Sequence, residues 1–252
     1  MQAKPLAGKT ALVTGAGRNI GRAIAVALAD AGANVGVNVR SSVEEGRAVV
    51  DEITAAGGAA LLVQADVTQR AQVDAMVAAV AARFGGLNIL VNNAATRLEA
   101  PFPELSYADW RGAFEACVDG AFHCTQAAWP WLIKDGGAVI NMGGLTAHTG
   151  AAERAHVVAA KAALVGFTRG LAHDFAPHGV AVNCVVPGLV DTVRGGGSSK
   201  ANPKHHAGRK NLLERRGTPE EIASAVLWLA GPGGQYTTGQ SIHVNGGAFL
   251  GS

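Results

Sequence analysis

Aromatic residues are scarce in this chain: only 5% of its 252 residues are Phe, Trp or Tyr, and just two are tyrosines, Tyr107 and Tyr236. Charged residues are also few, at 16%, and the formal net charge is only +2. No block of Lys and Arg has the length or the interleaved aromatic residues that are typical of a nucleic-acid surface. We therefore exclude nucleic acid as a partner and expect a small molecule instead.

Cysteine is rare as well, and the three residues form no CxxC pair: Cys117, Cys124 and Cys184. An odd number of cysteines fits a reducing compartment better than a disulfide framework. No apolar run approaches the length of a membrane span, and residues 1–9 contain no apolar signal region. No set of His, Cys, Asp and Glu has the spacing of metal ligands. We expect a cytoplasmic protein with no membrane contact and no metal site.

Apolar runs of strand length alternate with helical segments along the whole chain. A length of 252 residues and a hydrophobic content of 48% allow one large core. Such alternation predicts a parallel sheet that is covered by helices on both faces. The expected strands are 10–13, 34–39, 60–64, 89–92, 138–142, 180–186 and 241–244. The longest expected helices are 106–134, interrupted near Pro130, and 153–176.

The predicted organisation is a single α/β domain over residues 1–252, with a doubly wound sheet of about seven parallel strands. One segment within it, 193–216, differs in composition. It combines Gly195, Gly196 and Gly197 with several Lys, Arg and His residues. We expect it to be a mobile lid over the site, and its positive charge would favour an anionic substrate.

The segment 14–21, Thr-Gly-Ala-Gly-Arg-Asn-Ile-Gly, lies between the first strand and an amphipathic helix. This order would direct the free N–H groups and the positive dipole end of the helix at a pyrophosphate. Gly15 and Gly17 permit backbone angles and a close approach that a Cβ would block, and Gly21 lets the helix pack tightly on the strand. The segment therefore predicts a dinucleotide-binding turn.

Further motifs follow this turn in a familiar order. Asp66 and Val67 form an acidic and apolar pair, 92–95 reads Asn-Asn-Ala-Ala, and Asn183 precedes Pro187-Gly188 and Thr192. With segments 216–223 and 239–247, the chain resembles the short-chain dehydrogenase/reductase family over essentially its whole length. The resemblance implies a Rossmann-type fold. It also implies a cofactor site formed by Thr14, Gly15, Gly17, Arg18, Asn19, Ile20, Gly21, Arg40, Asp66, Val67, Asn93, Ala94, Lys161, Pro187, Gly188 and Thr192.

Two of these motifs depart from the family pattern. Asn19 stands where a glycine is usual, but Asn adopts positive φ more readily than most residues. Ala95 replaces the glycine of the NNAG motif. Neither change removes the expectation of nucleotide binding.

Charge at the end of the second expected strand predicts which nucleotide binds. An NAD site carries an Asp or Glu there, which binds the ribose hydroxyls and repels a 2′-phosphate. This chain has Val39 followed by Arg40, and Arg18 lies in the glycine turn. Arginine offers a planar fork of donors to phosphate, so we predict NADP, with NADPH favoured over NADH.

The family resemblance implies four catalytic residues, Asn, Ser, Tyr and Lys, and three of these positions differ here. Lys161 is present, but the position of the Tyr, four residues earlier, is Val157. The position of the Ser is Gly144, and that of the Asn is Cys117. Valine cannot move a proton and glycine has no side-chain donor, so we predict an atypical site without the usual Tyr acid/base.

Several polar residues near these positions are candidates to replace the tyrosine. We rank His148 first because it follows the fifth strand and an imidazole has a suitable pKa. Glu153 comes second, since positions 153, 157 and 161 would share one helix face, and His156 third. Thr146 lies nearby.

Two further residues have alternative roles. In the family that the chain resembles, the residue at Lys161 also binds the nicotinamide ribose, so its presence favours cofactor binding. Cys117 is an alternative nucleophile, although a buried packing role is more usual for such a residue.

Three functions are consistent with these residues. The preferred one is an atypical NADP(H)-dependent oxidoreductase that transfers hydride to or from a small substrate, with an anionic one favoured by the basic segment. The second is a non-catalytic NADP-binding sensor or structural protein. The third is lyase or hydrolase chemistry in the same pocket. The family resemblance further implies a homodimer or homotetramer built on helices 106–134 and 153–176.

Overall fold

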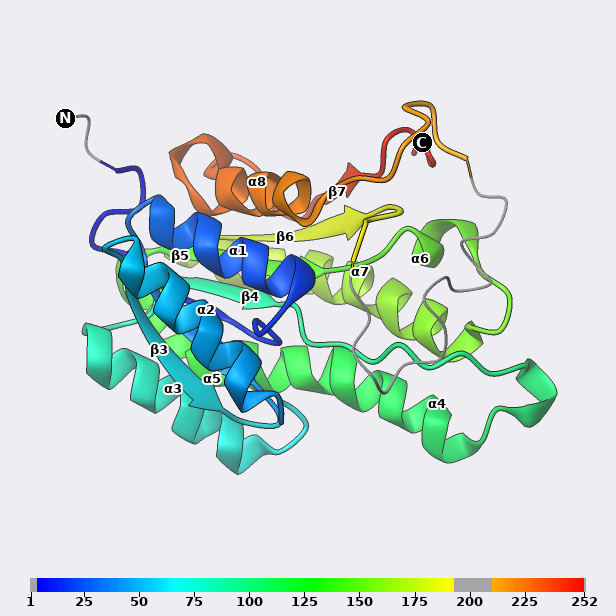
Figure 1. The fold of residues 1–252 in the computed structure, drawn as a ribbon, viewed down its shortest axis with the longest axis horizontal. Coiled ribbons are helices and arrows are strands. Elements are labelled where there is room, and N and C mark those ends of the chain that lie inside the picture. The colour runs from blue at the N-terminus through cyan, green and yellow to red at the C-terminus, as the bar shows by residue number, and fades with distance from the viewer. Residues whose placement is uncertain (1–3, 193–209, 252) are drawn as a thin grey trace.

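A parallel sheet of seven strands runs through the molecule in the order β3-β2-β1-β4-β5-β6-β7 (Figure 1). The computed structural model describes residues 4–192 and 210–251. The strands are β1 (Thr10–Val13), β2 (Asn34–Val39), β3 (Ala59–Gln64), β4 (Ile89–Asn92), β5 (Gly137–Met142), β6 (Val180–Pro187) and β7 (Ser241–Val244). Every neighbouring pair is parallel. The predicted fold class is confirmed, and each expected strand is present.

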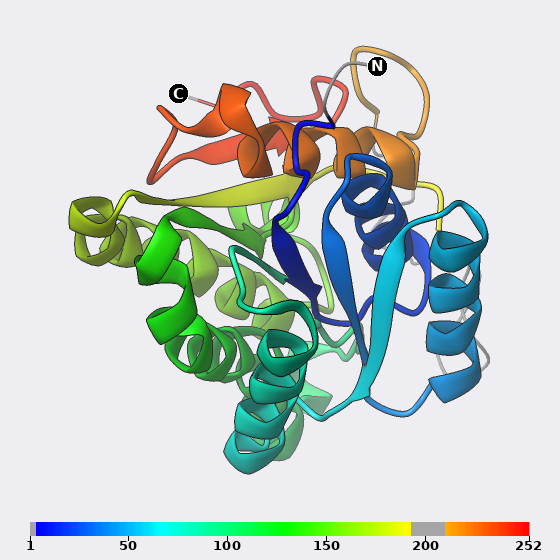
Figure 2. The ribbon, with the colours of Figure 1, turned by 90° about the vertical axis from the view of Figure 1, so that its left-hand side faces the viewer.

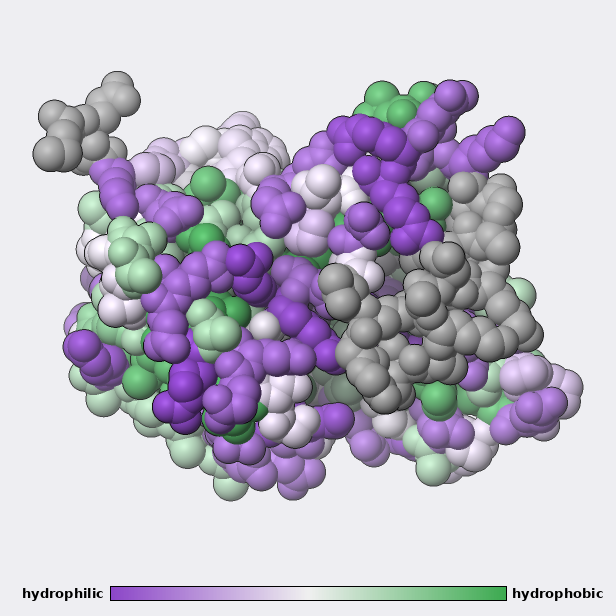
Figure 3. Space-filling model, in the orientation of Figure 1, coloured by the Kyte–Doolittle hydropathy of each residue, from purple (hydrophilic) through white to green (hydrophobic). Residues whose placement is uncertain are grey.

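Helices cover both faces of this sheet (Figure 2). Residues of α1, α2 and α8 share one core with the strands, and residues of α3, α5 and α7 share the other. The helices are α1 (Asn19–Asp30), α2 (Val43–Ala55), α3 (Arg70–Phe84), α4 (Tyr107–Phe114), α5 (Gly120–Asp135), α6 (Thr146–Thr149), α7 (Ala155–Phe175) and α8 (Pro219–Ala230). On the surface drawn in Figure 3, hydrophobic residues form only small groups among hydrophilic ones.

The strands are apolar on both sides, which explains why their sequences read as continuous hydrophobic runs. In β4, Ile89 and Val91 belong to the core under α1 and α8, whereas Leu90 belongs to the core under α3 and α5. The same alternation occurs in β5, where Ile140 and Val139 lie in different cores. A period of two with both faces buried is the pattern of a sheet covered by crossover helices.

The expected helix break near Pro130 is absent, because Pro130 lies inside α5. A proline leaves the carbonyl four residues earlier, that of Gln126, without its helical partner. Both residues are exposed, so water can satisfy that carbonyl. The irregular turn of this region lies earlier, as a π-helical segment at Glu115–Asp119.

The helix expected over 153–176 also needs correction. It begins only at Ala155, because Glu153 has a left-handed φ of 59°. A residue with that backbone angle cannot lie in the interior of a right-handed helix.

Buried polar side chains join the central strands to the helices on one face of the sheet. The Asn92 amide donates to Asn141 Oδ1 at 2.9 Å and to Thr125 Oγ1 at 3.1 Å. Asn141 in turn donates to Thr168 Oγ1 at 2.9 Å. Because unpaired polar groups are costly when buried, these bonds favour one relative position of β4, β5, α5 and α7.

The order of strands reverses between β1 and β4, which are neighbours although β2 and β3 intervene in the sequence. Ligands of open α/β sheets bind at the carboxyl ends of the strands beside such a reversal. Among the residues that the structure describes, no helix is both long and apolar enough to cross a lipid bilayer.

Candidate functional site

The turn between β1 and α1 has no room for side chains at its glycines. Gly15 has a left-handed φ of 61°. A Cβ on Gly21 would lie 2.3 Å from the Gly15 carbonyl oxygen and 2.7 Å from Asn93 Nδ2. Asn19 takes a φ of 50°, as the sequence predicts for a residue in place of glycine. The glycines therefore let the turn pack closely against the loop after β4.

Hydrogen bonds hold this turn against the loop after β4. The Asn93 side-chain amide donates to the carbonyls of Thr14 and Gly15 at 2.9 and 3.0 Å. The Thr14 hydroxyl accepts from the backbone N–H groups of Asn93 and Ala94. On the other side, Gly15 N–H donates to Asn38 Oδ1 at 3.2 Å. These residues fix the shape of the turn from within.

Positive charge flanks the turn. Arg18 is the N-cap residue of α1, and no side chain caps that helix end. A Cβ on Gly17 would touch Val39 Cγ1 at 3.0 Å, so the turn packs directly on the end of β2, beside the exposed Arg40. Glu45 lies 3.5 Å from Arg18, and both side chains are about half exposed. Such a weak exposed ion pair can yield to a phosphate.

Asp66 and Val67 occupy the loop after β3. Asp66 Oδ1 accepts from the backbone N–H and the hydroxyl of Thr68 at 3.0 and 2.9 Å, which shapes the loop. Val67 is buried, and a Cβ on Gly120 would meet its Cγ2 at 2.7 Å. The loop is thus packed against the start of α5.

A cavity of about 190 Å³ opens at the carboxyl ends of β4, β5 and β6. Its described lining residues are Ile20, Asn93, Ala95, Thr96, Arg97, Met142, Gly143, Gly144, Leu145, Thr146, Arg154, Val157, Lys161, Pro187, Gly188, Leu189, Val190 and Thr192. Six of the predicted cofactor residues are among them: Ile20, Asn93, Lys161, Pro187, Gly188 and Thr192. The cavity is therefore continuous with the predicted nucleotide turn.

Lys161 projects into this cavity from α7. It is buried, and its ammonium group donates to the Met142 carbonyl at 2.5 Å. Gly144 lies next to it: a Cβ there would meet only Lys161 Cγ, at 3.9 Å. Val157, one helical turn before Lys161, is 3% exposed and lines the same space. Gly144, Val157 and Lys161, which stand at the predicted positions of the Ser, Tyr and Lys, therefore lie together in the structure.

The sequence of this chain is similar to those of known reductases over nearly its whole length. A family model described as enoyl-(acyl carrier protein) reductase matches residues 15–248. The 3-oxoacyl-(acyl-carrier-protein) reductase FabG of Staphylococcus aureus is 37% identical over 243 residues, covering 96% of this chain and 98% of that protein. The 3-oxoacyl-(acyl-carrier-protein) reductase of Synechocystis is 35% identical over 252 residues, covering 97% and 98%.

Solved structures agree over the same length. A short-chain dehydrogenase from Burkholderia cenocepacia in complex with NADP is 36% identical, with a TM-score of 0.90 over 97% of this chain and 99% of that one. A blue fluorescent protein from a metagenomic library, in complex with NADPH, is 36% identical, with a TM-score of 0.89 over the same shares of the two chains. The chain belongs to the short-chain dehydrogenase/reductase family.

In this short-chain dehydrogenase/reductase, neither tyrosine lines the cavity. Tyr107 begins α4 and is 78% exposed, and Tyr236 is fully exposed between α8 and β7. Cys117 packs in a small apolar cluster with residues of α7 and is absent from the described lining. Burial raises the pKa of Cys124 to about 12 and that of Cys184 to about 11, so these thiols stay protonated and unreactive.

The candidate replacements for a tyrosine separate in space. Thr146 lines the cavity, but His148, Glu153 and His156 are not among the described lining residues. Glu153 precedes α7 and does not share a helix face with Val157. His156 is fully buried, and burial lowers its pKa.

His148 instead packs against the C-terminal part of the chain. Its ring centroid lies 4.5 Å from that of His243 and 5.3 Å from that of Phe249. Desolvation lowers the pKa of His148, with a further contribution from Arg169. Desolvation also lowers the pKa of His243, and His148 adds to that shift. This three-ring cluster favours neutral imidazoles.

An ion pair that the sequence does not predict adjoins the cavity. Arg154, the N-cap residue of α7, is 9% exposed and lies 3.6 Å from Glu99. Arg97, on the same loop as Glu99, also lines the cavity. In the sequence, Arg97 and Glu99 are ordinary loop charges, and only the fold brings them to the start of α7.

The predicted lid lies largely outside the described residues, because the structure describes only 210–216 of segment 193–216. Within the part of the chain that is described, no cluster of three or more His, Cys, Asp or Glu residues could hold a metal.

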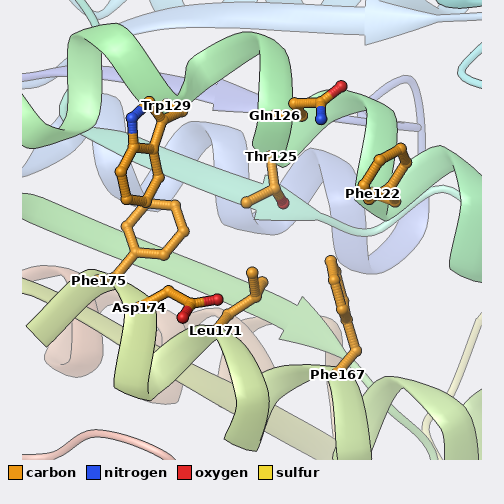
Figure 4. Close-up of a pocket in the computed structure, with 8 residues that line it drawn as sticks. All are labelled: Phe122, Thr125, Gln126, Trp129, Phe167, Leu171, Asp174 and Phe175. Carbon is orange, nitrogen blue, oxygen red and sulfur yellow. The ribbon is translucent and has the colours of Figure 1, made fainter.

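A second hollow, of about 510 Å³, lies on the helical surface between α5 and α7 (Figure 4). Aromatic and aliphatic side chains dominate its lining: Phe122, Thr125, Gln126, Trp129, Phe167, Leu171, Asp174 and Phe175. None of these residues lines the first cavity, and they belong to the two helices that we expect to form a subunit contact.

We expect the free energy of unfolding to fall when the pH drops from about 7.5 to about 5.5. The pKa values of His148 and His243 are lower in the folded state than in the unfolded chain. Their contribution is thus complete above the unfolded pKa, about 6.5, and is lost as the pH falls below it. Urea denaturation at both pH values measures the difference. His243→Phe should reduce the pH dependence, and the exposed control His173→Gln should leave it unchanged. An unaltered slope in His243→Phe would contradict the prediction.

Proposed function

We propose that this protein is an NADP(H)-dependent oxidoreductase that acts on a small carbonyl or similarly activated substrate without a tyrosine acid. The observation that carries the proposal is the junction of the glycine turn with a cavity that holds Lys161 but has Gly144 and Val157 beside it. The family assignment supports the redox chemistry, and the residue types in the cavity support the departure from the usual proton transfer.

The turn fits a dinucleotide. A pyrophosphate needs backbone N–H groups and close backbone approach, and the start of α1, which no side chain caps, would supply them together with the glycines of the turn. Arg18 and Arg40 would bind a 2′-phosphate. The related structures in complex with NADP and NADPH agree with this choice of cofactor. Bound there, the cofactor supplies or accepts the hydride.

The residues of this chain would then orient the substrate and stabilise charge. The Lys161 ammonium, anchored on the Met142 carbonyl, retains protons that can be donated to a developing alkoxide or to the nicotinamide ribose. Thr146 lines the same cavity and offers a hydroxyl donor. Val157 excludes water from one side. The final proton would come from solvent, with Lys161 stabilising the negative charge until it arrives.

This arrangement suits substrates whose reduction does not demand a strong acid. Examples are imines, enones and carbonyls with an electron-withdrawing neighbour. Two of the relatives are, by their names, reductases of 3-oxoacyl-(acyl-carrier-protein) substrates, which contain a carbonyl group. We include in the proposal a cytoplasmic location, which is supported by three buried cysteines that form no disulfide.

The proposal also includes a homodimer or homotetramer formed through α5 and α7. Phe122 is 45% exposed in the hollow between these helices, and Phe167 and Leu171 line the same surface (Figure 4). A hollow with partly exposed apolar side chains on two adjacent helices is typical of a surface that packs against another copy.

We expect NADPH to bind more tightly than NADH, as measured by the fluorescence change of the reduced nicotinamide. The double variant Arg18→Gln/Arg40→Gln should lower the affinity for NADPH by about 10-fold to 100-fold, because two charge-assisted hydrogen bonds are lost. The affinity for NADH should change little. Equal affinities of the unmodified protein for the two cofactors would refute the assignment of Arg18 and Arg40.

The variant Gly144→Ser/Val157→Tyr should gain reductase activity toward simple ketones, because a hydroxyl donor and a phenol acid then face Lys161. General acid catalysis of this kind contributes about 100-fold or more. The matched control is Gly144→Ser/Val157→Phe, which has the same bulk without the phenol. NADPH consumption on a panel of ketones, imines and enones provides the measurement. If the unmodified protein binds NADPH but consumes none on any substrate, a sensor function replaces the enzymatic one.

Phe122→Glu should shift the protein toward a smaller species in size-exclusion chromatography with light scattering. The added charge would be buried without a partner at the α5–α7 surface. Phe102→Glu is a control at an exposed position outside the α5–α7 hollow. A monomeric unmodified protein would overturn the proposed assembly.

A further inference from the structure

The cavity carries an excess of positive charge that the nucleotide turn does not use. Its described lining contains three cationic side chains, Arg97, Arg154 and Lys161, and no Asp or Glu. Glu99, which is not among the described lining residues, lies 3.6 Å from Arg154. A cavity of this kind attracts an anion.

Arg154 is built into its position. It forms the N-cap of α7, its side chain is only 11% exposed, and so is that of Glu99. Burying two charges has a high desolvation cost, so this ion pair need not stabilise the fold. It does hold the Arg154 side chain in one position. A guanidinium has five N–H donors, so its contact with Glu99 is compatible with further bonds to a ligand in the cavity that Arg154 lines.

Val157 and Lys161 lie on the same side of α7, four residues apart, and Arg154 is the N-cap residue at the start of this helix. All three line the cavity. The six steps from Ala155, the first residue of α7, to Lys161 correspond to a rise of about 9 Å along the helix axis. A small substrate that places its reacting group near Lys161 and Gly144 would thus extend past Val157 toward the two arginines.

We infer that Arg154 and Arg97 bind a carboxylate on the substrate, and that this carboxylate competes with Glu99 for the Arg154 guanidinium. A carboxylate matches the planar fork of donors of an arginine, and its single charge is within what the cavity can balance. The inference rests on the proposed function in one respect only, namely which end of the substrate reacts. The binding of the carboxylate itself does not require turnover.

The test uses levulinate and its methyl ester as probes, titrated by calorimetry into the full-length protein with and without saturating NADP. These probes have the same ketone and differ in charge. Levulinate should bind at least about 10-fold more tightly than the ester, the difference expected for one hydrogen-bonded charge pair. Equal binding of the two probes, or no binding of either, would overturn the inference.

Variants separate recognition from folding. Arg154→Gln should lower the affinity for levulinate by about 10-fold and leave that for the ester unchanged, whereas the matched exposed control Arg83→Gln should alter neither. Glu99→Gln is the sharper variant, because it removes the internal competitor for Arg154 and should raise the affinity for levulinate. A purely structural ion pair predicts no change or a loss. If Arg154→Gln fails to fold, Glu99→Gln and Arg97→Gln carry the test.

NADP affinity, measured on the same variants, distinguishes failure of the carboxylate site from failure of the cofactor site. Retained NADP binding with a lost preference for levulinate in Arg154→Gln supports the carboxylate site. A protein that binds levulinate selectively but not NADP would refute the proposed cofactor and leave the carboxylate site standing. Selectivity that survives in Arg154→Gln/Arg97→Gln would refute the carboxylate site alone.

Discussion

The side-chain amide of Asn93 joins the ends of two strands that are distant in the sequence, and the geometry of the site depends on that contact. Its donors reach the carbonyls of Thr14 and Gly15. Gly21 makes the contact possible, because any side chain there would overlap both the Asn93 amide and the Gly15 carbonyl. A dipeptide after β4 and a turn after β1 thus become one rigid surface next to the cavity.

The same junction explains why cofactor binding and chemistry can vary independently in this fold. The backbone turn depends on strand ends, glycines and buried amides, whereas the reacting end depends on side chains from α7 and from the loop after β5. Gly144 and Val157 line the cavity and take no part in the hydrogen bonds that shape the turn. A nearly complete nucleotide turn is therefore compatible with a departure in proton transfer, and only the side chains in the cavity indicate which substrates fit.

Much of the site could be predicted because local pattern and short-range geometry agree. The left-handed φ of Asn19 and the placement of Lys161 with Gly144 and Val157 follow from motif spacing. Predictions fail where tertiary contacts determine the outcome. Spacing alone assigns Glu153 to a helix face, but the chain turns sharply there and α7 begins two residues later. The loop position of His148 suggests an acid in the site, yet its ring packs on His243 from the last strand.

The sequence by itself determined the alternation of strands and helices, the glycine turn, the basic residues beside it and the lack of a nearby tyrosine, because these are properties of composition and of spacing within a few residues. Only the tertiary structure decided which polar groups share the cavity. Arg97 and Arg154 are 57 positions apart in the sequence, and the path of the chain from β4 to α7 brings them together at the cavity. A helical or strand period reports which face a side chain takes on its own element, and it carries no information about the element that lies opposite.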